Sequence, residues 1–97
     1  MEKFQMNNKM YSVKWTHSSV DTPTRTTLCE IFDDSLPEFP ITYAWSSLSK
    51  KDKDKFSRRF GRRLSFQRAL IGSFTKEERT AIWKYALTYF ITSLIDN

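Results

Sequence analysis

The hydrophobic pattern of the chain changes its period once, near residue 49, and this change limits the fold more than any other feature. Before it, apolar side chains recur at every second residue, as in a strand with one covered face. After it, they recur at the spacing of a helix. Strands followed by helices predict an α+β domain. A chain of 97 residues is long enough for one such domain with a modest core.

Three strands are expected in the first half of the chain. Residues 10–17 alternate apolar and polar side chains, which is typical of a strand covered on one face. Residues 25–32 are apolar or β-branched on both faces, as in a central strand, and their position predicts a hairpin with residues 10–17. Residues 39–46 are expected to form the third strand, with Pro40 at its start, where a missing N–H is tolerated.

Two helices are expected in the second half. The first spans residues 49–71, with a capping box formed by Ser49 and Asp52. The second spans about residues 76–95 and follows a capping box over residues 75–78. The predicted fold class is therefore α+β, with a small antiparallel sheet of about three strands, including an N-terminal hairpin, packed against two C-terminal helices.

The ends of the chain and its compartment are also predicted. Residues 1–9 are polar and are expected to form a flexible leader, which leaves residues 10–97 as a single domain. The single cysteine excludes an internal disulfide and fits a reducing compartment, so we expect the protein in the cytoplasm. The longest apolar run is far too short to span a membrane, and no membrane partner is expected.

Catalysis is not expected. Symmetric pairing of the predicted hairpin places Cys29 opposite Val13 and His17 opposite Arg25, so the only thiol and the only imidazole lie about 13 Å apart. A nucleophile and its base need about 3 Å. Cys29 is therefore interpreted as a buried structural cysteine. The nearby acidic residues are interpreted as part of a solvated loop: Glu30, Asp33, Asp34 and Glu38. The sequence predicts no enzyme, no metal site and no cofactor.

A block of basic residues is the strongest functional signal. Residues 50–68 contain nine basic and two acidic residues, in a chain with a net charge of +5. Like charges at i and i+4 destabilise a helix, and a helix that needed only solubility would mix its signs. The block therefore predicts an anionic partner, either nucleic acid or an acidic protein surface, with a plain solvated face as the alternative. The expected contact residues are Lys51, Lys55, Arg58, Arg59, Arg62, Arg63 and Arg68.

The same helix carries an apolar seam that is expected to face the sheet. At about 100° per residue, the seam consists of Phe56, Phe60, Leu64, Phe66, Leu70 and Ile71. The opposite side consists of Lys51, Lys55, Arg58 and Arg62. Arg63 falls inside the apolar sector. Either Gly61 breaks or bends the helix there, or the Arg63 side chain extends to solvent or to a buried acid.

Two further sets of apolar side chains have functional alternatives. Trp15, Tyr43 and Trp45 on a sheet face would suit stacking with single-stranded nucleic acid, although a place in the core is favoured. The last helix is apolar over more than half of its circumference, so a second apolar face would suit a two-fold dimer, with burial inside the monomer as an equal alternative. The expected dimer interface consists of Trp83, Leu87, Ile91 and Leu94.

Two segments of the helical half carry a specific pattern. Residues 60–70 read Phe-Gly-Arg-Arg-Leu-Ser-Phe-Gln-Arg-Ala-Leu, and residues 78–83 read Glu-Arg-Thr-Ala-Ile-Trp. This pattern resembles a group of small bacteriophage-encoded proteins without an established activity, and the likeness covers roughly residues 40–85. After residue 83 the chain departs from that group, because an apolar segment takes the place of a polar tail. The resemblance implies phage origin and a cytoplasmic location in the infected bacterium.

Charge and resemblance together give the leading hypothesis. Small non-enzymatic phage proteins commonly bind host machinery or host defences. We therefore expect a non-catalytic phage accessory protein that binds and modulates or inhibits a host factor, such as a defence or nucleic-acid-processing complex, through the basic helix. The first alternative is a nucleic-acid-binding protein that contacts phosphates with the same helix. The second is a structural or assembly protein that dimerises through the C-terminal helix.

Overall fold

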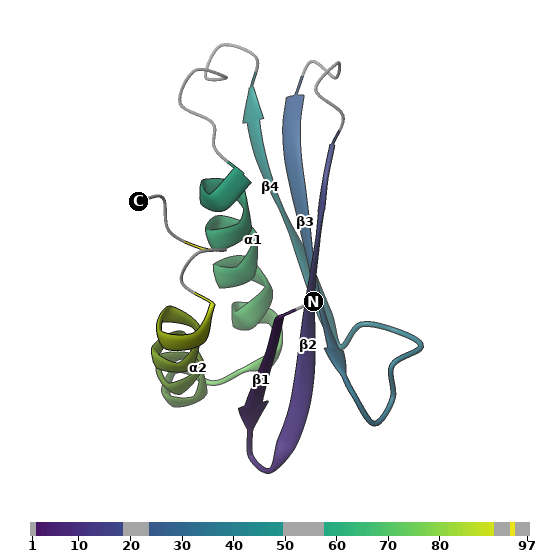
Figure 1. Ribbon diagram of the computed structural model, residues 1–97. Coiled ribbons are helices and arrows are strands. Elements are labelled where there is room, and N and C mark those ends of the chain that lie inside the picture. Colours follow the sequence, from purple (N-terminus) through teal and green to yellow (C-terminus); the bar gives the residue numbers. More distant parts are fainter. Residues whose placement is uncertain (1, 19–23, 50–57, 91–93, 95–97) are drawn as a thin grey trace.

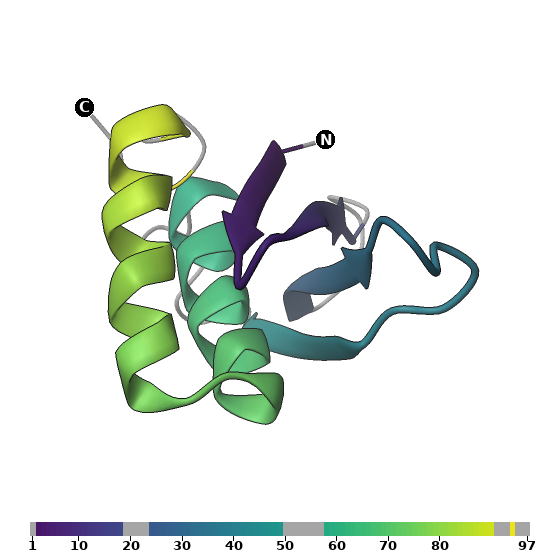
Figure 2. The ribbon, with the colours of Figure 1, turned by 90° about the horizontal axis from the view of Figure 1, so that it is seen from below.

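A computed structural model describes residues 2–18, 24–49, 58–90 and 94. Its elements, in chain order, are β1 (Glu2–Met6), β2 (Lys9–His17), β3 (Thr24–Asp33), β4 (Thr42–Ser49), α1 (Arg58–Ser73) and α2 (Lys76–Tyr89). The strands form one antiparallel sheet in the order β1-β2-β3-β4. Both helices lie on the same face of this sheet (Figures 1 and 2). The predicted α+β fold is confirmed, with four strands where about three were expected.

The prediction of a flexible leader over residues 1–9 is wrong, because β1 is an edge strand of the sheet. Asn7 and Asn8 form the turn to β2 with φ values of 54° and 63°. Asparagine tolerates this left-handed conformation, which two-residue hairpin turns require. Phe4 is buried and lies opposite Tyr11, and the two rings stack with their centres 5.2 Å apart.

The hairpin of β2 and β3 is present, but its register differs by two residues from the expected one. Cys29 lies opposite Trp15, and His17 lies opposite Thr27. Symmetric pairing assumed that the strands end where the pattern ends, whereas β3 extends to Asp33, which pairs with Tyr11 at the start of the ladder. A shift of two residues leaves every side chain on its expected face of the sheet.

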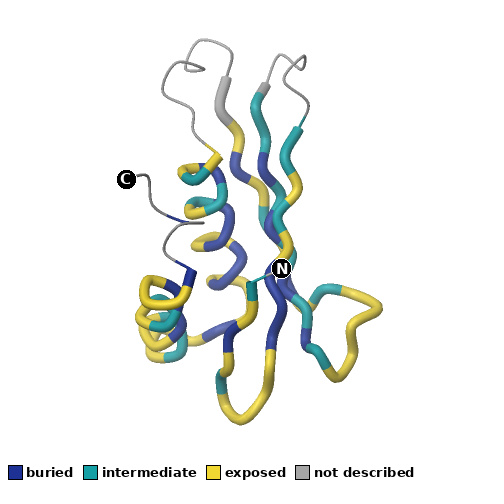
Figure 3. The backbone as a smooth tube through the Cα atoms, viewed as in Figure 1, coloured by how far each residue is buried: buried dark blue, intermediate teal, exposed yellow. Residues whose placement is uncertain are grey.

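Helix α1 packs closely on the sheet through a stripe that contains small side chains. Its buried residues are Gly61, Ser65, Phe66, Ala69 and Leu70. Two hydroxyls of β4 donate to carbonyls of α1, Thr42 Oγ1 to Ala69 O at 2.8 Å and Ser46 Oγ to Gly61 O at 3.1 Å. A Cβ atom added at Gly72 would lie 2.6 Å from Thr42 Oγ1, so the end of α1 comes too close to β4 for a side chain there. The buried stripe faces the sheet in Figure 3.

The predicted seam of α1 is only partly right. Phe66 and Leu70 are buried, but Phe60 is 38% exposed and Ile71 is 60% exposed. The prediction assumed that the largest apolar side chains face the sheet. Instead, Gly61, Ser65 and Ala69 share the buried stripe with two large side chains, and these small residues allow the helix backbone to reach the hydroxyls of β4. The helix orientation therefore differs from the predicted one.

The start of α1 also differs from the prediction. Ser49 is the last residue of β4 and α1 begins at Arg58, so Ser49 does not cap this helix. Asp52 and Phe56 lie outside the described residues. The helix continues through Gly61 without a break. The helix break at Gly61, one of the explanations offered for Arg63, is therefore wrong.

Helix α2 begins at the predicted capping box. The Thr75 hydroxyl accepts a hydrogen bond from the Glu78 amide at 3.2 Å, and the Glu78 carboxylate accepts one from the Thr75 amide at 2.8 Å. The helix ends at Tyr89, earlier than the predicted residue 95, and Phe90 is its C-cap residue. Leu94 is buried, while residues 91–93 and 95–97 lie outside the described part of the chain.

Replacing Phe4 with alanine tests whether β1 is part of the core. The Phe4 ring contacts the rings of Tyr11, Phe66 and Phe74. We expect Phe4→Ala to lower the free energy of unfolding by about 3–5 kcal/mol, because it leaves a cavity among these rings. Gln5→Ala, at the next and exposed position, is the control and is expected to change it by less than about 0.5 kcal/mol. Equal, small effects of both substitutions in urea unfolding would contradict the place of β1 in the core.

Candidate functional site

Arg62 faces the sheet, whereas the predicted seam places it on the opposite side of α1. Its Nη1 donates to His17 Nε2 on β2 at 3.3 Å, and its backbone carbonyl accepts a hydrogen bond from Trp15 Nε1 at 3.1 Å. The rotation of α1 described above explains the difference, since the stripe of small residues brings Arg62 over the end of the sheet. Arg62 is therefore a contact between α1 and β2 as well as a surface cation.

The other predicted cations point in different directions. The Arg63 guanidinium lies 5.6 Å from the centre of the Phe60 ring, and Arg63 is exposed, which corrects its placement in the apolar sector. Arg68 Nη1 donates to the Trp45 carbonyl of β4 at 2.9 Å. Arg58 is exposed and Arg59 is half-buried. The predicted contacts Lys51 and Lys55 lie outside the described residues.

Helix α1 carries five arginines and no acidic residue. Four of the five lie within its first two turns, at the end where the helix dipole is positive. Cations there are destabilised both by the dipole and by one another. Among the described residues, Arg58, Arg63 and Arg68 make no ion pair with a carboxylate. We call Arg58, Arg59, Arg62 and Arg63 the arginine cluster.

His17 is part of the contact between α1 and β2. A guanidinium can only donate, so His17 Nε2 accepts from Arg62, and the Nδ1–H group is left to donate to Thr27 Oγ1 at 2.9 Å. Burial lowers the pKa of His17, and the charges of Arg62 and Arg58 lower it further. The imidazole is therefore held neutral beside two cations.

The pKa of His17 predicts how stability depends on pH. Its ordinary value is 6.5 and its value in the folded protein is lower, so the unfolded chain binds the proton more readily. The free energy of unfolding is therefore expected to fall between about pH 7.5 and about pH 5.5. His17→Gln keeps an acceptor for Arg62 without titrating, and it should reduce this fall in thermal or urea unfolding.

Titration of the carboxylates does not contribute to the change in stability that this test measures. Hydrogen bonds lower the pKa values of Asp33, Asp34 and Glu78 from ordinary values of 3.8, 3.8 and 4.5. Their contribution to stability is lost only as the pH falls below those ordinary values, outside the measured range. An unchanged pH dependence in His17→Gln would contradict the neutral imidazole.

A groove of about 560 Å³ lies between α1 and α2. Its lining consists of Arg63, Gln67, Ile71, Lys76, Arg79, Thr80, Trp83 and Leu87. It brings Arg63, a predicted anion contact, together with Trp83 and Leu87, which were predicted in a separate dimer interface. The spacing of the lining residues by three or four positions indicates one row on each helix. The sequence alone does not show that the two rows face each other.

The predicted dimer interface is not one surface. Leu94 is buried in the core, so it is not available to a second copy, and this corrects its assignment. Trp83 is partly buried, with its ring 5.1 Å from the ring of Phe66. Leu87 is 40% exposed, and Ile91 lies outside the described residues. Dimerisation itself stays a prediction.

The face of the sheet away from the helices carries two exposed aromatic side chains. Tyr43 is 64% exposed and Trp45 is 51% exposed, so their predicted place in the core is wrong. Alternation along β4 gives the reason, because Thr42, Ala44 and Ser46 face α1 and the core, whereas Tyr43 and Trp45 face away. Trp15 packs against the core, beside Phe66 and Phe90, as favoured by the sequence.

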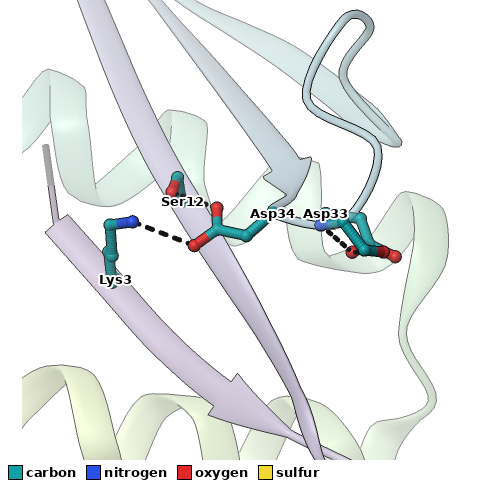
Figure 4. A network of polar contacts seen from close by, with 5 residues as sticks. Lys3, Ser12, Asp33 and Asp34 are labelled. Carbon is teal, nitrogen blue, oxygen red and sulfur yellow. Dashed lines mark hydrogen bonds and ion pairs between the residues drawn. The ribbon is translucent and has the colours of Figure 1, made fainter.

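The acidic residues at the end of β3 are structural. Asp34 accepts hydrogen bonds from Ser12 and Lys3, and Asp33 accepts two from Ser35, as Figure 4 shows for the labelled pairs. Glu30 and Asp33 lie in β3, and Asp33 is also buried, so the interpretation as a solvated loop is wrong for these two residues. These bonds tie the start of the 34–41 loop to β1 and β2. Within the described ranges, no three His, Cys, Asp or Glu side chains are grouped as metal ligands.

Cys29 is fully buried in the core, as predicted. Burial raises the pKa of the Cys29 thiol far above its ordinary value, and the nearby Glu30 carboxylate raises it further. The reactive form of cysteine is the thiolate. The thiol therefore stays protonated and packs as an apolar side chain.

Comparison with known protein families, with curated proteins and with solved structures finds no match to this chain. The phage resemblance and the functions that it implies therefore stay predictions. Neither helix in the described part of the chain has the length and apolar character needed to span a membrane.

Proposed function

We propose that this chain is a non-catalytic accessory protein of a bacteriophage that binds a host factor and modulates or inhibits it. The contact is the arginine cluster at the start of α1. The observation that carries the proposal is the charge of α1, with five arginines and no acidic residue. The phage origin rests on the resemblance of residues 60–70 and 78–83.

Arg58, Arg63 and Arg68 of α1 make no ion pair with a carboxylate among the described residues, so their charge calls for a compensating interaction. An anionic partner removes both the mutual repulsion of the arginines and their repulsion from the helix dipole. Arginine suits this role because its planar guanidinium binds carboxylates with two parallel hydrogen bonds. Arg58 and Arg63 are exposed and have donors available for such contacts.

The arrangement of the arginines favours an acidic protein surface over a phosphate backbone. Arg62 reaches toward β2, Arg63 lines the groove beside α2, and Arg68 reaches β4. A nucleic acid backbone presents its phosphates in a regular row, which cations on three sides of a helix do not match. Carboxylates on a protein surface have no such regular spacing.

Charge reversal in the arginine cluster tests the proposal. We expect Arg58→Glu/Arg59→Glu to weaken capture of a host protein from bacterial lysate by at least about tenfold, or about 1.4 kcal/mol, because the variant presents like charge to the acidic partner. The pull-down is performed with nuclease, so that nucleic acid does not bridge the two proteins. Unfolding measurements establish that the variant is folded.

The matched control is Lys14→Glu/Lys84→Glu, which also reverses two positive charges, at exposed positions of β2 and α2 outside the arginine cluster and the groove. It should leave capture unchanged. Equal capture by wild type, Arg58→Glu/Arg59→Glu and the control would contradict a role for the arginine cluster.

A second function is favoured by one observation on the sheet. Tyr43 and Trp45 are exposed on its open face, and Arg68 donates to the Trp45 carbonyl at the edge of the same strand. Exposed aromatic rings beside a cation are the elements of a single-strand nucleic acid site. This function would use base stacking on β4 together with phosphate contacts from α1.

Binding of a fluorescent single-stranded oligonucleotide tests this second function. We expect Tyr43→Ala/Trp45→Ala to weaken binding by about 1–3 kcal/mol per stacked base, and the affinity to fall steeply with salt as counterions are released. Phe39→Ala, which removes another exposed ring but from the 34–41 loop, is the control. Oligonucleotide binding that is insensitive to salt and to the β4 rings would contradict the second function.

A further inference from the structure

We propose that the groove between α1 and α2 is the docking site for an acidic, amphipathic helical segment of the partner protein. This inference rests on the proposed function and deepens it, because it names the chemistry of the partner. The groove lies beside the arginine cluster and shares Arg63 with it.

Two helical rows form the sides of the groove. Arg63, Gln67 and Ile71 are spaced by four residues along α1. The α2 side consists of Lys76, Arg79, Thr80, Trp83 and Leu87. The distance from Lys76 to Leu87 corresponds to about 16 Å of helix. The two helices lie side by side in Figures 1 and 2. A groove of this length suits about three turns of a docked helix.

The charge of the lining indicates that the docked segment is negatively charged. Arg63, Lys76 and Arg79 are cationic, and the lining contains no Asp or Glu. Arg79 Nη1 donates to the Phe74 carbonyl at 2.8 Å, which holds this side chain in place and leaves its other N–H groups for a ligand. Glu78 is turned away toward the β1–β2 turn, where Asn7 donates to it.

The apolar part of the lining identifies the second property of the occupant. Ile71 is 60% exposed and Leu87 is 40% exposed, although each lies in a helix next to the core. Trp83 lines the same groove, and its ring packs edge-to-face with the buried Phe66 ring at 5.1 Å between centres. A partly buried tryptophan flanked by exposed aliphatic side chains is typical of the anchoring centre of a protein interface.

An acidic amphipathic helix satisfies both properties at once. Its apolar side chains at i, i+4 and i+7 would cover Ile71, Trp83 and Leu87, while its carboxylates would meet the three cations. A nucleic acid strand has no branched aliphatic side chains to cover Ile71 and Leu87. A second copy of this chain offers the exposed Leu36 and Phe39 of its 34–41 loop, but with a single exposed acid, Glu38.

A synthetic peptide tests the groove without any host factor. The probe is a fluorescein-labelled peptide of about 15 residues with Leu at i, i+4 and i+7, three Glu residues beside that face, and Ala at the remaining positions to favour a helix. The control peptide has the same composition in scrambled order. We expect the patterned peptide to bind at least tenfold more tightly than the scrambled one in fluorescence anisotropy, because only the patterned peptide presents its leucines on one face.

Variants of the chain locate the binding site. Ile71→Glu and Leu87→Glu change exposed side chains, so the fold is retained, and each should weaken binding of the patterned peptide at least tenfold. Lys76→Glu should weaken it as well. Lys84→Glu makes the same charge change on α2 outside the groove and should leave it unaltered.

Three results would overturn the inference. Equal binding of both peptides would show a response to charge alone. Displacement of the patterned peptide by an oligothymidine of equal charge would assign the groove to nucleic acid. Self-association in light scattering that Ile71→Glu abolishes would assign it to a second copy of the chain. The peptide experiment uses no host protein. Its failure would therefore not contradict the capture experiment with Arg58→Glu/Arg59→Glu, and failure of the capture experiment would not contradict binding of the peptide.

Discussion

The ring of Phe66 is the contact on which the rest of the structure depends. It lies on α1, is fully buried, and meets Phe4 of β1, Trp15 of β2, Trp83 of α2 and Phe90 after α2, with ring centres 5.1–6.3 Å apart. Each edge-to-face pair adds about 0.5–1.5 kcal/mol beyond the burial of its area. One side chain therefore joins the sheet and both helices, and it explains why β1, at the far edge of the sheet, is part of the core.

The same packing sets the direction of the arginines. Gly61, Ser65 and Ala69 bring the backbone of α1 against β4, and this contact fixes the rotation of the helix. At that rotation Arg62 reaches His17, Arg68 reaches the β4 backbone, and Arg63 lines the groove. Charge on α1 is thus distributed around the helix by the core, and the side facing α2 combines cations with an apolar floor.

The sequence predicted which segments form strands and helices better than it predicted which face of each element is buried. Period and capping identified β2, β3 and α2, because alternation and the Thr75 box are local signals. It missed β1, where only two apolar residues alternate before the Asn7–Asn8 turn. Alternation divides a strand into two faces but does not show which face is covered. The predicted place of Tyr43 and Trp45 in the core is wrong for this reason. The groove could not be predicted, because it depends on how α1 and α2 lie against each other, which the core decides.

The proposed partner meets the helical side of the molecule and not the open face of the sheet. Amide hydrogen exchange of the chain, measured alone and in complex with a captured host protein, tests this most directly, because it reports both sides at once. We expect slower exchange in the first turns of α1 and along α2 on binding, with β4 unchanged. Slower exchange in β4, with both helices unchanged, would contradict it.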